Sequence, residues 1–115
     1  MTLEDIVNAK SDLMKQGRMA DAAEQYFADT ASSNDHNGST TASRSDMVEK
    51  MNGFVGSIAK VNEITLHNTA VSGDVSFTEW TFDFDHSDGS KTHWHEIIRS
   101  VWEDGKIVNE QYFLA

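Results

Sequence analysis

Residues 75–103 decide the fold, and they read VSFTEWTFDFDHSDGSKTHWHEIIRSVWE. Apolar and aromatic side chains recur at about every second position on both sides of a polar tetrapeptide, Ser87-Asp88-Gly89-Ser90. A period of two and an enrichment in β-branched and aromatic residues are typical of strands. Asp-Gly between two such runs is a strong hairpin signal. The stretch therefore predicts two antiparallel strands, Val75–Asp85 and Lys91–Glu103, joined by a tight turn.

The same pattern continues on both sides of this hairpin. It predicts further strands at Val61–Val71 and Lys106–Leu114, separated from the first two by Ser72-Gly73-Asp74 and Asp104-Gly105. A four-stranded antiparallel meander results. The chain has no proline to protect an edge strand, so we expect strong curvature or pairing with a second subunit.

Before residue 60 the apolar residues recur with a helical period, which predicts three helices. The first begins after Thr2, which stands three residues before Asp5 as in a capping box, and Gly17 ends it. The second spans residues 19–27, and the third follows Ser43. Residues 28–41 are rich in Ser, Thr, Asn, Asp and Gly, which predicts a loop with at most a short strand.

These elements predict a single α+β domain over residues 1–115. Three N-terminal helices would pack on a curved four-stranded meander, with a possible short extra strand, and would enclose a polar-lined pocket for a small organic molecule. A chain of 115 residues is long enough for one such core and too short to require a second domain.

Composition excludes several classes of function. The formal net charge of −10 opposes binding to nucleic acids and to anionic membranes. The chain has no cysteine, so it has no disulfide, thiolate metal site or cysteine nucleophile. Its first ten residues lack the basic start and apolar run of a signal peptide, and no window is apolar enough to span a membrane. A cytoplasmic location is the resulting expectation.

The turn fixes which side chains share a face of the sheet. If Asp88-Gly89 is a two-residue turn, paired residues have numbers that sum to 177. One face then carries Glu79 and Thr81 near Glu96 and Trp94, with Trp102 beyond, and we expect this face to line the pocket. The other face carries Trp80, Phe82, Phe84 and Ile97, which suit a homodimer formed sheet to sheet. A shift of one residue would exchange the two faces.

Three short motifs and the order of elements carry a family resemblance. The motifs are Tyr26-Phe27-Ala28-Asp29 leading through Asn34-Asp35-His36 to Ser43, then Trp102-Glu103-Asp104-Gly105-Lys106-Ile107, and Glu110-Gln111-Tyr112-Phe113. Together they resemble the SnoaL-like polyketide cyclases, a branch of the nuclear transport factor 2-like superfamily of cone-shaped α+β barrels. The last motif is similar to the closing strand of the limonene epoxide hydrolases.

The resemblance implies a proton-shuttling carboxylate at Asp35, where ketosteroid isomerase relatives carry an aspartate. In those relatives a tyrosine and a protonated aspartate form the oxyanion hole. The matching positions here hold Ser11 and Ile98, which argues against steroid isomerisation. The Asp-Arg-Asp set of the epoxide hydrolases matches Thr81, Glu79 and Gln111, so that triad is also missing. The resemblance therefore supports a superfamily and not one activity.

Three carboxylates are the candidate catalytic residues. Asp35 is a possible general base, although a turn aspartate that bonds its own loop would look the same in sequence. Glu79 and Glu96 would lie close together on the inward face and could share a proton, unless solvent or a cation such as Arg99 neutralises them. His93 and His95 have a spacing that allows joint metal ligation, but no third ligand is evident, so we expect no metal site.

These observations predict a cofactor-free isomerase, cyclase or hydrolase that acts on a small organic ligand. Asp35 would move the proton, and Glu79 and Glu96 would act as the partner acid or orient water. The expected substrate-binding residues are Thr81, Trp94, Ile98, Trp102 and Gln111. The alternative is a non-catalytic ligand-binding or dimeric interaction module on the same fold.

Overall fold

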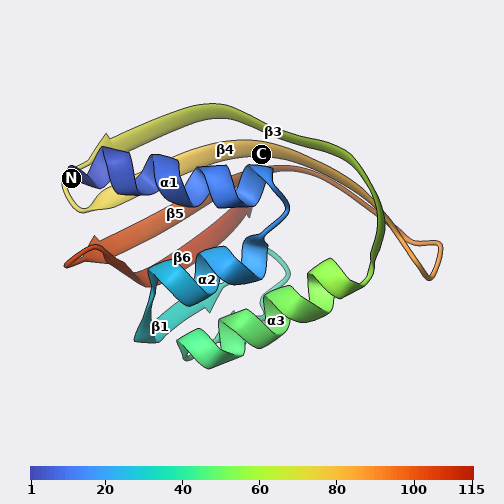
Figure 1. Ribbon diagram of the computed structural model, residues 1–115, viewed down its shortest axis with the longest axis horizontal. Helices are drawn as coiled ribbons and strands as arrows, with labels where there is room; N and C mark the ends of the chain where they lie inside the picture. The colour runs from blue at the N-terminus through green and yellow to red at the C-terminus, as the bar shows by residue number, and fades with distance from the viewer.

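The computed structural model describes residues 1–115 and begins with two short helices (Figure 1). Helix α1 (Leu3–Lys15) starts with the predicted capping box, in which Thr2 and Asp5 each accept the other's backbone N–H. Helix α2 (Met19–Tyr26) follows the turn at Gly17, whose φ of +76° suits a glycine. No helix is long and apolar enough to cross a membrane.

Helix α3 (Arg44–Gly56) also begins where the sequence predicts. The Ser43 hydroxyl accepts a hydrogen bond from the backbone N–H of Asp46, and the Asp46 carboxylate accepts one from Ala42. These bonds satisfy backbone groups that have no partner inside the helix. All three predicted helices are therefore confirmed.

The sheet has six strands, two more than the predicted four-stranded meander and one more than that meander with its possible short extra strand. It is mixed rather than wholly antiparallel. The strands are β1 (Phe27–Asn34), β2 (Thr40–Thr41), β3 (Ile58–Ser72), β4 (Val75–His86), β5 (Lys91–Glu103) and β6 (Lys106–Leu114). Their order across the sheet is β2-β1-β6-β5-β4-β3. The predicted meander is β3 to β6, and β1 adds to it by pairing parallel to β6.

The predicted loop at residues 28–41 was wrong over its first half. Strand β1 occupies residues 27–34 although Ser, Thr, Asn and Asp make up most of it. Its buried positions, Phe27, Ala31 and Ser33, face the core, and pairing with both β2 and β6 satisfies the backbone. Tertiary pairing thus overrides the weak strand propensity of these residues.

The predicted register of the β4–β5 hairpin was wrong by one residue. Paired residues sum to 176, so that Trp80 lies opposite Glu96 and Thr81 opposite His95. The connection is a three-residue loop, Ser87 to Gly89, in which His86 bonds Ser90 and Gly89 has a φ of +88°. This is the usual type I turn followed by a left-handed glycine, one residue longer than the predicted turn.

The corrected register turns β4 over relative to β5, so that Trp80 rather than Glu79 shares the inward face with Glu96 and Trp94. Trp80, Phe82 and Phe84 are at most 4% exposed and form the core beneath the helices. These residues therefore cannot form the homodimer interface that the sequence predicted. Figure 1 shows the long strands β3 to β5 arching over α2 and α3, so that this face is concave. The concave face and the helices enclose a cavity.

Candidate functional site

A cavity of about 330 Å³ lies between the helices and the concave face of the sheet. Thirteen of its eighteen lining residues are hydrophobic, contributed by all three helices and by β1, β4, β5 and β6. Its volume is at the small end of the range for ligand pockets. The other five lining residues are the charged residues Lys10, Asp35, Lys50, Glu96 and Glu110, and Tyr112 adds a hydroxyl group to the wall. An apolar wall with a few polar groups is typical of a site for a small organic molecule.

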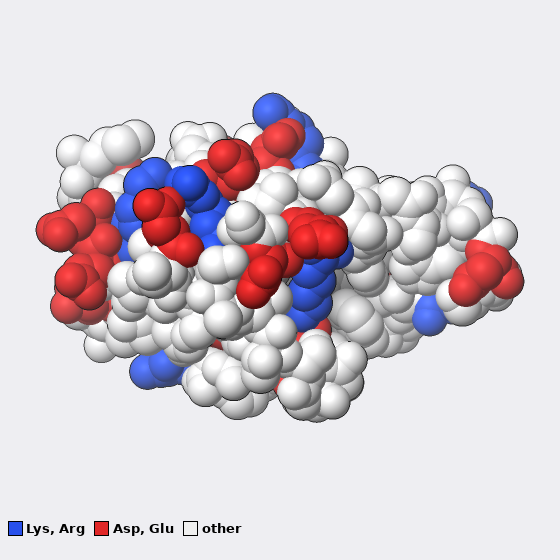
Figure 2. Space-filling model, turned by 90° about the horizontal axis from the view of Figure 1, so that it is seen from below, with Lys and Arg blue, Asp and Glu red and all other residues white.

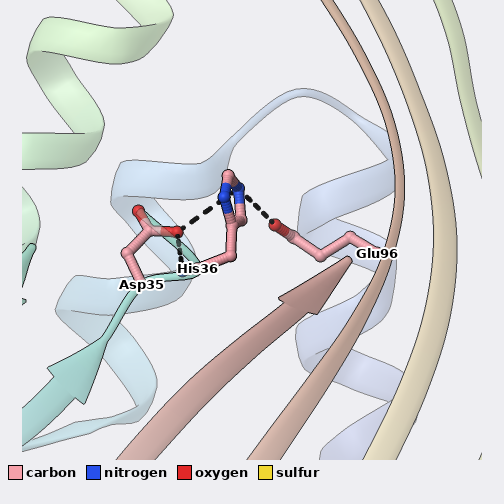
Figure 3. Close-up of side chains that lie close together, drawn as sticks. All are labelled: Asp35, His36 and Glu96. Atoms are coloured by element: carbon pink, nitrogen blue, oxygen red, sulfur yellow. Dashed lines mark hydrogen bonds and ion pairs between the residues drawn. The ribbon is translucent and has the colours of Figure 1, made fainter. Parts of the chain in front are cut away.

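Asp35, His36 and Glu96 form a compact cluster at this cavity (Figure 3). The first two follow directly after β1, and Glu96 projects from β5 toward the imidazole. His36 Nε2 lies 3.5 Å from Asp35 Oδ1 and 3.7 Å from Glu96 Oε2. This nitrogen is buried and has no hydrogen-bond partner within the protein. The cluster thus places two carboxyl groups on either side of one imidazole.

The Asp35 carboxylate is held from both sides. Lys50 Nζ from α3 lies 2.8 Å from Oδ2, and the backbone N–H of His36 donates to Oδ1 at 2.8 Å. An ion pair with an ammonium favours the charged carboxylate, the form that can accept a proton. The half-buried Lys50 therefore fixes the orientation of this carboxylate.

Glu96 differs from Asp35 because no hydrogen bond or cation fixes its carboxyl group. Its side chain is 7% exposed, and its nearest charged or titratable neighbour is His36. Burial raises the pKa of Glu96 to about 8, and the negative charges of Asp35 and Glu110 act in the same direction. At neutral pH this carboxyl group is mainly protonated and can donate a hydrogen bond or a proton.

A second polar group lies deeper, around Glu110 on β6. Its Oε2 accepts hydrogen bonds from Lys10 at 3.2 Å and from Ser100 at 2.6 Å, and its Oε1 accepts one from the Tyr112 hydroxyl. Burial and the charge of Glu110 raise the pKa of Tyr112 well above its usual value. All of these donors converge on one carboxylate, so Glu110 is neutralised inside the protein.

The cluster of Asp35, His36 and Glu96 also offers three donor atoms within 4.8 Å of one another, a set that divalent transition metals accept. The Lys50 ammonium, however, sits 2.8 Å from Asp35 and would repel a second cation there. The protonated form of Glu96 already offsets the repulsion between the two carboxyl groups. The geometry therefore favours a proton on Glu96 over a metal ion.

Four of the eight predicted site residues line the cavity, namely Asp35, Glu96, Trp94 and Ile98. The remaining four do not. Glu79, Thr81 and Gln111 belong to the outer face of the sheet, because Thr81 pairs with His95 and Gln111 pairs with Arg99 on that face. Trp102 faces inward but lies in a separate core cluster with Phe27 and Ile107, where its indole N–H donates to Ser76.

The expected pair of Glu79 and Glu96 was therefore wrong. Glu79 accepts hydrogen bonds from Asn68 and pairs with His95 on the convex side, and these bonds lower its pKa. On the same side, the Lys91 ammonium, assisted by Asn62 and His93, lowers the pKa of Asp83 to about 2. The carboxylates of Glu79 and Asp83 therefore have hydrogen-bond and ion-pair partners on the outer face, and nothing in their surroundings indicates a catalytic or binding site.

Sequence reasoning missed Lys10, His36, Lys50, Glu110 and Tyr112. A signal was present for the two lysines. Lys10 falls on the apolar face of α1 with Val7 and Met14, and Lys50 lies next to Met51 on the core side of α3. A charged residue at a helical position otherwise reserved for the core requires a buried partner. No comparable signal identified His36, Glu110 or Tyr112, because their contacts in the site form only in the folded chain.

The comparisons with known proteins agree with this architecture. Residues 9–110 match the family model of the SnoaL-like domain. No curated protein matches the chain in sequence.

Solved structures share the fold over nearly the whole chain. A proposed SnoaL-like polyketide cyclase from Mesorhizobium loti is 24% identical, with a TM-score of 0.86, and the match covers 98% of this chain and 99% of the other. A Catenulispora acidiphila protein with a ketosteroid isomerase-like fold, in complex with trimethylamine, is 18% identical, with a TM-score of 0.79 and coverage of 96% and 85%. TerC co-crystallised with polyporic acid is 10% identical, with a TM-score of 0.76 and coverage of 98% and 91%. The family match over most of the chain, with the same fold in these structures, shows that this chain belongs to the SnoaL-like domain family.

Proposed function

We propose that this protein is an enzyme that catalyses cofactor-free proton transfer in a small, mainly apolar organic molecule bound in the cavity. One observation carries the proposal: a protonated, unpartnered Glu96 and an ionised, oriented Asp35 lie on either side of His36 at the wall of an apolar cavity. Two carboxyl groups in different protonation states are the usual arrangement for an acid and a base. Two proteins of similar fold hold small organic molecules, trimethylamine and polyporic acid.

The chemistry follows from the two protonation states. Asp35 removes a proton from a carbon next to a carbonyl group, and Glu96 donates its proton to the carbonyl oxygen. The products of this step are an enol, a neutral Asp35 and an ionised Glu96. Return of the proton from Asp35 to another carbon, and of the hydroxyl proton to Glu96, completes an isomerisation without any other reactant. Trp94, Ile98 and Phe82 exclude water from the reacting atoms.

Solvent exchange tests this proposal with simple ketones in place of the natural substrate. In D₂O we expect the protein to exchange the acidic C–H protons of some members of a panel of small uncharged ketones, as measured by NMR. Asp35→Asn should slow that exchange about a hundredfold or more, since a positioned general base contributes roughly 10²–10⁴-fold. Glu103→Gln is the matched control, because Glu103 is an exposed residue at the far end of β5.

The pH dependence gives a second test of the same assignment. Because the acid must be protonated, the exchange rate should fall about tenfold per pH unit above pH 8, near the raised pKa of Glu96. Glu96→Gln should lower the rate and abolish this fall. If Asp35→Asn keeps the wild-type exchange rate while its circular dichroism is unchanged, the cavity is a binding site and not an active site.

We also propose that a second copy of the chain, if it binds, uses the outer face of the sheet. The aromatic residues Trp80, Phe82 and Phe84 are enclosed in the core, whereas Phe77 and Phe113 are 38% and 47% exposed outside it. Sedimentation equilibrium of the protein and of Phe113→Glu measures this. If the protein is a monomer at high concentration, it forms no homodimer and the proposal is wrong. If it is a dimer that neither Phe113→Glu nor Phe77→Glu disrupts, the outer face of the sheet is not the interface.

A further inference from the structure

Within the cavity, every charged side chain except Glu96 has a partner of opposite sign. Lys50 pairs with Asp35 at 2.8 Å, and Lys10 pairs with Glu110 at 3.2 Å. These two pairs contribute no net charge to the lining. The charge that a ligand meets in the cavity therefore depends on Glu96 alone.

The surroundings of Glu96 are suited to an organic cation when its carboxyl group is ionised. Trp94 lies two residues before it on the same face of β5, and its ring stacks on Phe54 with centroids 5.9 Å apart. Phe82 and Phe84 complete an aromatic wall in the same cavity. Aromatic faces attract ammonium groups, and they do so more strongly where water is excluded. A carboxylate within such a wall is a favourable environment for a bulky cation.

The same cavity suits an uncharged ligand when Glu96 carries its proton. The lining then has no unbalanced charge, and the carboxylic acid can donate to a carbonyl or hydroxyl oxygen. An anion finds no free cation in either state, because both lysines are already paired. Such a ligand would also approach the carboxylates of Asp35 and Glu110 in a low-dielectric space.

We propose that Glu96 selects the ligand by charge, so that the cavity binds uncharged organic molecules when this residue is protonated and organic cations when it is ionised. The inference rests on the proposed function only in using the same cavity, and it requires no turnover. Binding of a cation releases the proton of Glu96 to solvent. Anions of the same shape are excluded in both states.

Other titratable groups around Glu96 must be separated from it in any pH experiment. They are Asp35 and His36 after β1, Lys50 on α3, Lys10 on α1, and Glu110 and Tyr112 on β6. The imidazole of His36 is the main concern, since its Nε2 lies 3.7 Å from Glu96 Oε2. The variant His36→Gln isolates its contribution.

Three probes of one shape test the proposal. Benzyltrimethylammonium is the cation, dimethylbenzylcarbinol the uncharged molecule and phenylmethanesulfonate the anion. Isothermal titration calorimetry at pH 6 and pH 9 should show that the cation binds at least about tenfold more tightly at the higher pH. The affinity for the carbinol should instead fall at the higher pH, by up to about tenfold, because fewer Glu96 carboxyl groups are protonated there. The sulfonate should not bind at either pH. Titrations of the cation at pH 7 in buffers of different ionisation enthalpy should reveal proton release.

Variants assign the effect to Glu96. Glu96→Gln should bind the cation weakly at both pH values, whereas Glu103→Gln should behave as wild type and His36→Gln should keep most of the pH dependence. The proposal is overturned if the cation's affinity does not change with pH, if the change survives in Glu96→Gln, or if the sulfonate binds as tightly as the carbinol. If the protein exchanges ketone protons but shows no charge preference, only the binding proposal is wrong. If it shows the charge preference but exchanges no ketone protons, only the enzymatic proposal is wrong.

Discussion

At the scale of single residues, Glu96 is a proposed site residue whose ionisation costs stability. Its pKa is about 8 in the folded protein against a usual value of 4.5, so the folded state holds the proton more tightly than the unfolded chain does. The stability present below pH 4.5 is therefore lost progressively as the pH rises to about 8. One pKa unit corresponds to about 1.4 kcal/mol, so the loss is roughly 5 kcal/mol.

This cost predicts a stabilising substitution. Glu96→Gln keeps the shape of the side chain and cannot ionise, so it should lie within about 1 kcal/mol of the wild type at pH 5 and exceed its free energy of unfolding by a few kcal/mol at pH 9. Urea denaturation of both proteins at the two pH values measures the difference. A variant that is less stable than the wild type at pH 9 would show that the burial of Glu96 carries no such penalty.

In contrast to Glu96, the buried Lys10, paired with Glu110, should stabilise the folded protein. Lys10→Met should cost about 3–5 kcal/mol of unfolding free energy, because it leaves the Glu110 charge buried with only Ser100 and Tyr112 as donors. The double variant Lys10→Met/Glu110→Gln should recover most of this loss. If urea denaturation shows the same free energy of unfolding for Lys10→Met and the wild type, this expectation is wrong.

At the scale of elements, the β4–β5 loop explains what the sequence could and could not predict. The strands themselves were predictable, because their period of two is unbroken from Val75 to Glu103. The register was not, because Asp88-Gly89 fits both a two-residue turn and the three-residue loop that forms. This difference of one residue in the register places Glu79 outside the cavity and Trp80 in the core, the reverse of what was predicted.

The two carboxylates that line the cavity show the same limit. Asp35 was identified through a family resemblance. Glu96 was identified through its position in β5, whose inward face was assigned correctly, whereas the inward face of β4, which carries Glu79, was not. Their partners Lys50 and His36 come from elements that only the folded chain brings together. Contacts across such distances leave no periodic pattern in the sequence.

Two glycines in different backbone conformations give a matched prediction. Gly89→Ala should cost about 1 kcal/mol, because the φ of +88° is unfavourable for alanine although its Cβ would meet no atom. Gly53→Ala should instead stabilise the protein by up to about 1 kcal/mol, since Gly53 lies inside α3 and its Cβ is also free of contacts. Thermal unfolding of the two variants compares them directly. Equal effects would contradict the backbone argument.

At the scale of the whole molecule, the net charge of −10 acts on the compact state as a whole. Figure 2 shows acidic side chains gathered in several patches over one face, with Lys and Arg beside only some of them. Repulsion between unpaired carboxylates destabilises a folded protein, whereas exposed ion pairs such as Arg18 with Asp21 contribute little. The repulsion should therefore outweigh the surface pairs.

Salt separates these two contributions. The Debye length falls from about 30 Å at 0.01 M salt to about 3 Å at 1 M, so added NaCl screens the long-range repulsion first and leaves the buried pair of Lys10 and Glu110 nearly unaffected. We expect the Tm at pH 7 to rise by several degrees between 0.01 M and 0.5 M NaCl, as measured by differential scanning calorimetry. The rise should be smaller at pH 5, where more of the surface carboxylates carry protons and the net negative charge is lower. A Tm that falls with salt at pH 7 would mean that the exposed ion pairs, and not the excess of acidic groups, dominate the electrostatics of the folded chain.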